Sequence, residues 1–199
     1  CQKTTMHTDT LMPYEIVHSC LESTDESEEL SLDVMWNNLK DYASDENAIV
    51  VIDGSGSMYW NASEPLPATV ALSLGIYFAE RNKGHFKNHF ITFSCSPQLV
   101  EIKGNTIAEK VRYCEQFNEC ANTDIDKVFS LILNTAIIYN LPPEELPKRL
   151  YIVSDMEFDM CAENAESSNF DNARKEFEEN GYTLPEVIFW NVAFRRSHY

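Results

Sequence analysis

A turn rich in glycine and serine carries the side chains of this 199-residue sequence whose types and spacing are best suited to chemistry. It reads Asp53-Gly-Ser55-Gly-Ser57 and directly follows the apolar run at residues 48–52. Glycine at the intervening positions permits unusual dihedral angles, so the carboxylate and both hydroxyls can point to one side of a tight turn. Hard divalent cations prefer oxygen ligands, and Mg²⁺ takes six of them while keeping some waters. The turn therefore predicts a site for a divalent metal ion.

Two further polar loops would complete such a site. Thr123 precedes an apolar helical stretch, where it would also suit a capping role, and Asp155 follows a second apolar run at residues 149–153. Sites in parallel α/β folds lie outside the carboxyl ends of the strands, so we expect both loops to meet the turn. The three loops would then bring hydroxyl and carboxylate oxygens to one end of the sheet.

The elements that must position these residues alternate along the chain. Short apolar runs predict buried strands, and apolar residues spaced three and four apart predict helices. The runs at 89–93 and 98–102 are so close that only a hairpin can join them, which gives one antiparallel edge strand. The order predicts a doubly wound α/β fold with a mostly parallel sheet and helices on both faces. Strands are expected at 48–52, 89–93, 98–102, 149–153 and 186–190, and helices at 30–42, 68–81, 107–117, 126–139 and 172–179.

The turn after a strand, the threonine before a helix and the aspartate after the next strand resemble the metal-ion-dependent adhesion site (MIDAS) of von Willebrand factor A (vWA) domains. The resemblance spans roughly residues 48–192. It implies a Rossmann-like fold and direct or water-mediated ligation of Mg²⁺ or Mn²⁺, with Ca²⁺ as a further option, by Ser55, Ser57 and Thr123. Asp53 and Asp155 would act largely through waters. One coordination position would remain for an acidic group of a protein partner.

A more specific resemblance is to a domain-of-unknown-function family related to the Ro/TROVE ribonucleoproteins. The segments that carry it are residues 122–124, 150–159 and 185–191. In those proteins the A-type domain follows a helical RNA-binding region. We expect residues 1–46 to form an N-terminal extension with an acidic loop and one helix, and residues 47–199 to form the vWA-like domain. Because only residues 191–199 follow the last expected strand, that domain is expected to lack its final strand and helix, as in a fragment.

The net charge of the chain argues against nucleic acid as a direct partner. The chain has 32 acidic and 15 basic residues, a net charge of −17, which repels phosphate backbones. We therefore expect no direct nucleic-acid binding by this domain, and any RNA binding would lie in a helical region outside it. The six cysteines lack metal-ligand spacing and are interpreted as mainly buried free thiols. The start of the chain lacks a signal peptide and no run is long enough to span a membrane, so a cytoplasmic protein is expected.

Catalysis is the alternative class of function, either by a serine nucleophile or by a metal-assisted hydrolase. A nucleophilic Ser55 would need a base, yet the five histidines all lie outside the three loops and the G-x-S-x-G pattern is not met. We therefore predict a binding module and no enzyme. Residues beside the predicted ligands would form the rim that contacts a partner: Tyr59, Trp60, Asp124 and Glu157.

Overall fold

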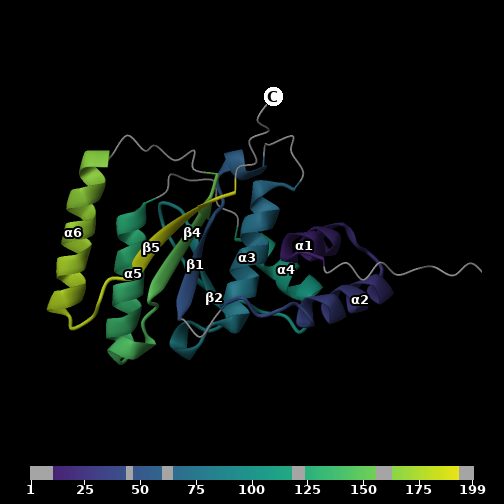
Figure 1. The fold of residues 1–199 in the computed structure, drawn as a ribbon, viewed down its shortest axis with the longest axis horizontal. Coiled ribbons are helices and arrows are strands. Elements are labelled where there is room, and N and C mark those ends of the chain that lie inside the picture. Colours follow the sequence, from purple (N-terminus) through teal and green to yellow (C-terminus); the bar gives the residue numbers. More distant parts are fainter. Residues whose placement is uncertain (1–10, 44–46, 60–64, 118–123, 156–162, 193–199) are drawn as a thin grey trace, which may run out of the picture.

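The computed structural model describes residues 11–43, 47–59, 65–117, 124–155 and 163–192. A five-stranded sheet in the order β3-β2-β1-β4-β5 forms the centre of the molecule (Figure 1). The β1–β2, β1–β4 and β4–β5 pairs are parallel, whereas β3 runs antiparallel to β2. The predicted α/β class and the antiparallel edge strand are therefore confirmed. The strands are β1 (Ala48–Asp53), β2 (His89–Phe93), β3 (Leu99–Glu101), β4 (Arg149–Ser154) and β5 (Glu186–Asn191).

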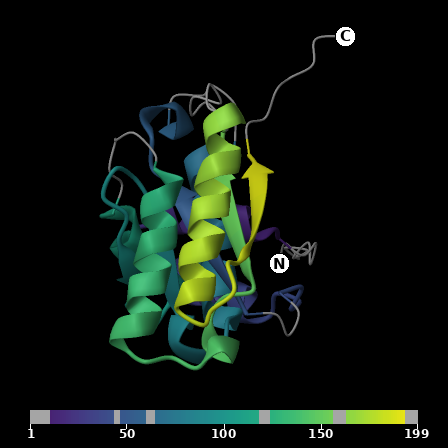
Figure 2. The same ribbon diagram turned by 90° about the vertical axis from the view of Figure 1, so that its left-hand side faces the viewer.

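Helices cover both faces of this sheet, as alternating side chains of the buried β1 require. Val50 and Ile52 face one hydrophobic core, and Ile49 and Val51 face the other. The helices α5 (Ile125–Ile138) and α6 (Glu163–Glu179) cover the second core and run side by side in Figure 2. The first core is covered by α1 (Pro13–Glu22), α2 (Glu26–Asn37), α3 (Pro67–Arg81) and α4 (Ile107–Glu115).

The first 43 residues contribute two helices to the first core. The single helix expected at 30–42 begins earlier, at Glu26, because Asp25 accepts a hydrogen bond from the Ser27 backbone N–H and caps it. The helix α1 was not expected at all. It buries Ile16, Val17 and Cys20 against α3 and α4. Short helices gain most of their stability from such packing, which a single apolar patch in the sequence does not reveal.

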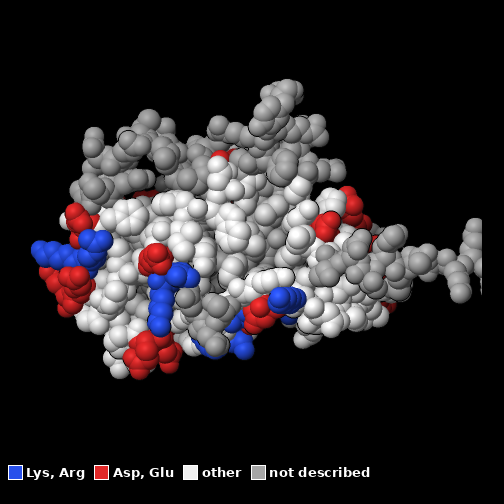
Figure 3. All heavy atoms as spheres, in the orientation of Figure 1, with Lys and Arg blue, Asp and Glu red and all other residues white. Residues whose placement is uncertain are grey.

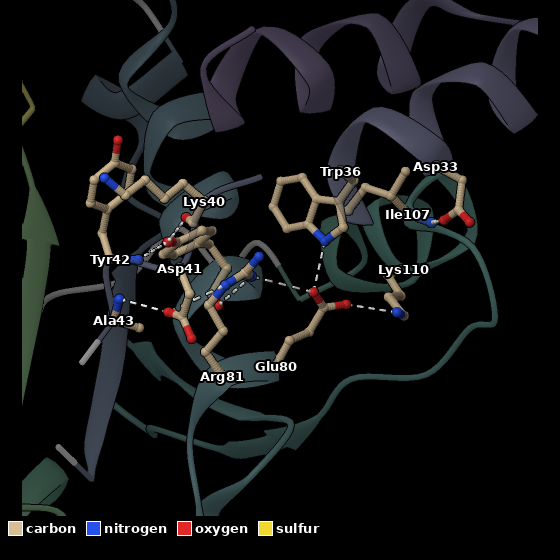
Figure 4. A network of polar contacts seen from close by, with 11 residues as sticks. Asp33, Trp36, Lys40, Asp41, Tyr42, Ala43, Glu80, Arg81, Ile107 and Lys110 are labelled. Carbon is tan, nitrogen blue, oxygen red and sulfur yellow. Dashed lines mark hydrogen bonds and ion pairs between the residues drawn. The ribbon is translucent and has the colours of Figure 1, made fainter. Parts of the chain in front are cut away.

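Polar contacts fix α2 against α3 and α4. Trp36 donates from Nε1 to the Glu80 carboxylate at 2.7 Å, and Lys110 forms an ion pair with the same carboxylate at 2.6 Å (Figure 4). Asp33 accepts a hydrogen bond at 2.8 Å from the backbone N–H of Ile107, the first residue of α4. The N-terminal segment is thus joined to the sheet-bearing part of the chain by both apolar and charged contacts.

Charged side chains avoid the middle of one face. Figure 3 shows red and blue groups toward the left and along the lower margin and further red groups on the right, with a largely uncharged surface between them. Aromatic rings of α3, β4 and β5 also pack together: Phe78 stacks on Tyr151 at 5.1 Å between ring centroids, and Trp190 lies 6.0 Å from Tyr151. Within the described ranges, no helix combines the length and apolar character needed to cross a membrane.

Candidate functional site

The candidate site lies where β1 and β4 end. Asp53 is the last residue of β1 and Ser154 the last residue of β4. Because these strands are parallel and pair with Ile52 opposite Val153, their carboxyl ends meet at one edge of the sheet. The sequence prediction that the loops after these strands come together is confirmed for the described residues.

Asp53 is held from two directions. Its Oδ1 accepts a hydrogen bond of 2.8 Å from the backbone N–H of Ser55, which forms the turn, and its Oδ2 accepts one of 2.6 Å from the hydroxyl of Ser154. The residue is only 2% exposed. A buried carboxylate requires such partners, because desolvation without them is costly. The carboxylate is therefore fixed in orientation while keeping further lone pairs for other contacts.

The two serines of the turn lie next to each other. Their Oγ atoms are 3.1 Å apart, and both residues are half-buried. The short 3₁₀-helix η1 (Gly56–Tyr59) creates this arrangement, with the Met58 N–H bonded to the Ser55 carbonyl at 3.1 Å. Adjacent ligands of an octahedral ion with bonds of 2.0–2.1 Å lie about 3 Å apart. The hydroxyl pair fits two neighbouring positions around Mg²⁺.

Asp155 lies directly after β4 and is 6% exposed. Its backbone N–H donates to the Sδ atom of Met58 at 3.2 Å, and Met58 itself is fully buried beneath the turn. The thioether thus links the β1 turn to the loop after β4. Met58 and Ser154, which hold Asp155 and Asp53 in place, are site residues that the sequence prediction missed. The position of Ser154, one residue before a predicted ligand, was the only signal that pointed to it.

The remaining predicted site residues have different positions. Asp124 caps α5, because its Oδ1 accepts hydrogen bonds from the backbone N–H groups of Asp126 and Lys127. Tyr59 is 42% exposed at the end of η1, where a partner can reach it. The predicted ligand Thr123 and the predicted rim residues Trp60 and Glu157 lie outside the described residues.

Acidic groups lie close together near the start of α5. Burial, followed by the charges of Asp124 and Glu176, raises the pKa of Asp126 above its usual value. Lys127 partly offsets this charge with an ion pair of 3.5 Å to Asp124, and its Nζ also donates to the carbonyl of Cys95 at 2.7 Å. The acidic groups Asp124, Asp126 and Glu176 therefore outnumber the single lysine beside them.

Among the described residues, no group of three or more histidine, cysteine, aspartate or glutamate side chains is arranged so that it could hold a metal ion. A metal site here would accordingly depend on serine hydroxyls together with carboxylates. His89 is the first residue of β2 and His85 belongs to the 3₁₀-helix η2 (Gly84–Phe86) just before it. Because β1 and β2 are parallel, both histidines lie at the opposite end of the strands from Asp53, away from the serines that a hydrolase would use.

The fold that positions these residues is similar to that of a solved structure, the Ro (RSR) protein of Deinococcus radiodurans. The TM-score is 0.52, and the match covers 84% of this chain and 32% of that protein. With 14% sequence identity, the likeness shows a shared fold. The chain is thus an α/β protein with a Rossmann-like, mostly parallel sheet.

Residues 47–198 match the model of a family described as Domain of unknown function (DUF7788), and the chain belongs to that family. It is also 33% identical over 199 residues to the uncharacterized protein L728 of Acanthamoeba polyphaga mimivirus. That match covers 98% of this chain, so it includes the segment that carries α1 and α2. The chain spans 34% of the length of L728.

Proposed function

We propose that this chain is a vWA-type binding module that holds Mg²⁺ or Mn²⁺ at the Asp53 turn and, through the ion, binds an acidic group of a protein partner. The observation that carries the proposal is the pair of serine hydroxyls 3.1 Å apart beside a buried, doubly hydrogen-bonded Asp53. Asp155 at the end of β4 supplies a second carboxylate at the same edge of the sheet. Thr123 is proposed as a further ligand on the resemblance alone.

The chain's residues fit this ion chemically. Ser55 and Ser57 offer neutral oxygens at adjacent ligand positions, and Asp53 is oriented by Ser154 so that it can bind waters of the ion. Because the hydroxyls are neutral and the two aspartates are proposed to act through waters, the ion would keep its positive charge at an open position and attract a further anionic oxygen. The ion would supply a fixed positive charge at which a partner carboxylate could complete the coordination shell.

The charge of the whole chain makes the ion necessary for such a partner. With a net charge of −17, the domain repels an acidic protein surface unless a cation lies between them. We therefore propose that partner binding depends on the ion and is lost when a chelator removes it. The fold shared with the Ro (RSR) protein and the greater length of L728 support a role for such a module within larger proteins.

Isothermal titration calorimetry with MgCl₂ and MnCl₂ on the full chain tests the proposal. We expect saturable binding by the wild type and at least tenfold weaker binding by the Ser55→Ala, Ser57→Ala double variant. Ser31→Ala is the matched control, because it removes a hydroxyl from the exposed side of α2. Wild-type protein that binds neither ion, or a double variant that binds as well as the wild type, would overturn the proposal.

A further inference from the structure

A cavity of about 110 Å³ lies beside the Asp53 turn, on the side of the sheet covered by α1, α3 and α4. Ile52 and Gly54, on either side of Asp53, both line it, and Tyr59 lines it from the end of η1. It therefore adjoins the candidate metal site without sharing the predicted ligands. The lining also includes Leu66, Ala68 and Thr69.

The size and lining of the cavity define what it can hold. Most of the lining is aliphatic or aromatic, with Thr69, Thr92 and Glu115 as its polar members. A cavity of about 150 Å³ with an apolar lining holds benzene and stays free of water. One of 110 Å³ matches a smaller apolar group, such as the branched side chain of valine or leucine.

The cavity reaches the surface of the molecule next to the candidate metal site. Tyr59 is 42% exposed and Leu66 is half-buried, so the lining extends from the core to the outside of the molecule. Ligands of open α/β sheets bind outside the carboxyl ends of the strands, and this cavity lies at the ends of β1 and β2, where Ile52 and Thr92 are in register.

We infer that this cavity receives a branched aliphatic side chain of the same partner whose carboxylate would bind the ion; the inference rests on the proposed function. The net charge of −17 opposes an acidic partner at long range, so affinity beyond the ion must come from uncharged contacts. Burial of an isobutyl group contributes about 10- to 100-fold in affinity. The recognised feature is therefore a carboxylate with a valine, leucine or isoleucine close to it.

The apolar half of the inference can be tested without metal. In NMR titrations of the full chain with 3-methylbutan-1-ol, we expect shifts concentrated on the amides of the lining residues and none with the polar control propane-1,2-diol. Ala68→Leu fills the cavity and should abolish these shifts. Thr69→Val keeps the volume and removes a hydroxyl, so it should bind the alcohol at least as well as the wild type does. Loss of binding in Thr69→Val, or shifts spread over other parts of the chain, would overturn the inference.

The link between the cavity and the ion can be tested by measuring the affinity of N-acetylated, C-amidated dipeptides in the presence of MgCl₂. We expect Leu-Asp or Asp-Leu to bind at least tenfold more tightly than the matching Ala-Asp or Asp-Ala, and this preference to disappear in Ala68→Leu. Equal affinities for leucine and alanine peptides, with Mg²⁺ still bound, would overturn the inference and leave the proposed function standing. Absence of Mg²⁺ binding in wild-type protein that still binds the alcohol would overturn the proposed function and the acidic partner with it.

Discussion

Asp53 is only 2% exposed, so each contact to its carboxylate matters for stability as well as for any ligand. Its Oδ2 atom accepts a buried hydrogen bond of 2.6 Å from the Ser154 hydroxyl, which lies 101 positions away in the sequence. A buried acceptor that loses its donor bears the full desolvation penalty. The residues that orient the candidate ligands therefore also help to hold β1 and β4 together.

Replacing Ser154 tests this dual role. We expect Ser154→Ala to lower the free energy of unfolding by about 1–3 kcal/mol, because Asp53 loses a donor that is buried with it. Urea denaturation in EDTA measures the change. Ser73→Ala is the control: Ser73 is equally buried, but its hydroxyl donates at 2.8 Å to a carbonyl of its own helix. Equal losses of stability in both variants would contradict the role given to the Asp53 contact.

Two buried thiols make stability sensitive to alkaline pH. Burial raises the pKa of Cys20 to about 11 and that of Cys114 to about 12, from an ordinary value of 9.0. The unfolded chain therefore releases these protons at lower pH than the folded chain does. The resulting stability is fully present below pH 9 and is lost as the pH rises through the folded-state values.

We accordingly expect the free energy of unfolding to fall between pH 9 and pH 11, and to fall less steeply in a Cys20→Ala, Cys114→Ala variant. Guanidinium denaturation at several pH values measures both slopes. The exposed Cys95 supplies the control, because its replacement by alanine should leave the slope unchanged. Parallel pH profiles for the wild type and the double variant would show that the buried thiols do not contribute.

Two loops next to helices contain a glycine with a positive φ angle, a backbone conformation that residues with side chains rarely adopt. Gly104, in the loop before α4, has a φ of +130°, and a Cβ atom there would lie 2.8 Å from the backbone nitrogen of Lys110. Gly181, after α6, has a φ of +80° and no neighbour within 4 Å. Both positions disfavour a side chain by conformation, but only Gly104 adds a steric conflict with backbone.

The two glycines form a matched pair of variants. We expect Gly104→Ala to destabilise the chain by more than Gly181→Ala, for which conformational strain alone costs about 1 kcal/mol. Thermal unfolding followed by circular dichroism would rank them. If Gly181→Ala were the more damaging change, the close approach of residue 104 to α4 would not be a determinant of stability.

The sequence predicts the strands more accurately than the helices. The five strands were expected to within about two residues, because each is a short apolar run bounded by polar residues. The helix α6 begins at Glu163, well before the expected residue 172, since its first half is polar and carries no periodic apolar signal. The turn at Asp53 and the position of Asp155 followed from their places after strands. The Ser154 and Met58 contacts depend on the pairing of β1 with β4, which local sequence does not encode.

At the scale of the whole molecule, the N-terminal helices share a core with the sheet. Ile16 and Trp36 are at most 1% exposed, and they pack in the same cluster as Ile76 of α3 and Val111 of α4. The family match begins at residue 47, yet the structural core extends to residues before it. The sequence division at residue 46 therefore falls within one hydrophobic cluster.

Deletion of residues 1–43 tests this shared core. We expect the shortened chain to have a markedly lower melting temperature and to bind the dye ANS, because the α3 and α4 faces lose their apolar cover. The full chain carrying Leu30→Ser is the control, since that side chain is 59% exposed. A shortened chain that melts at the same temperature as the full chain would show that residues 44–199 fold without the N-terminal helices.

The long separation between Asp53 and Ser154 also has a consequence for biosynthesis. A ribosome that adds about 5–20 residues per second completes the Asp53 turn roughly 5–20 s before it reaches the serine that holds the carboxylate. The β1–β4 pairing, which brings Asp53 and Ser154 together, is delayed by the same interval. During that interval the apolar β1 has no β4 to pair with. An apolar strand that stays unpaired for this long is exposed to aggregation and to factors that bind nascent chains.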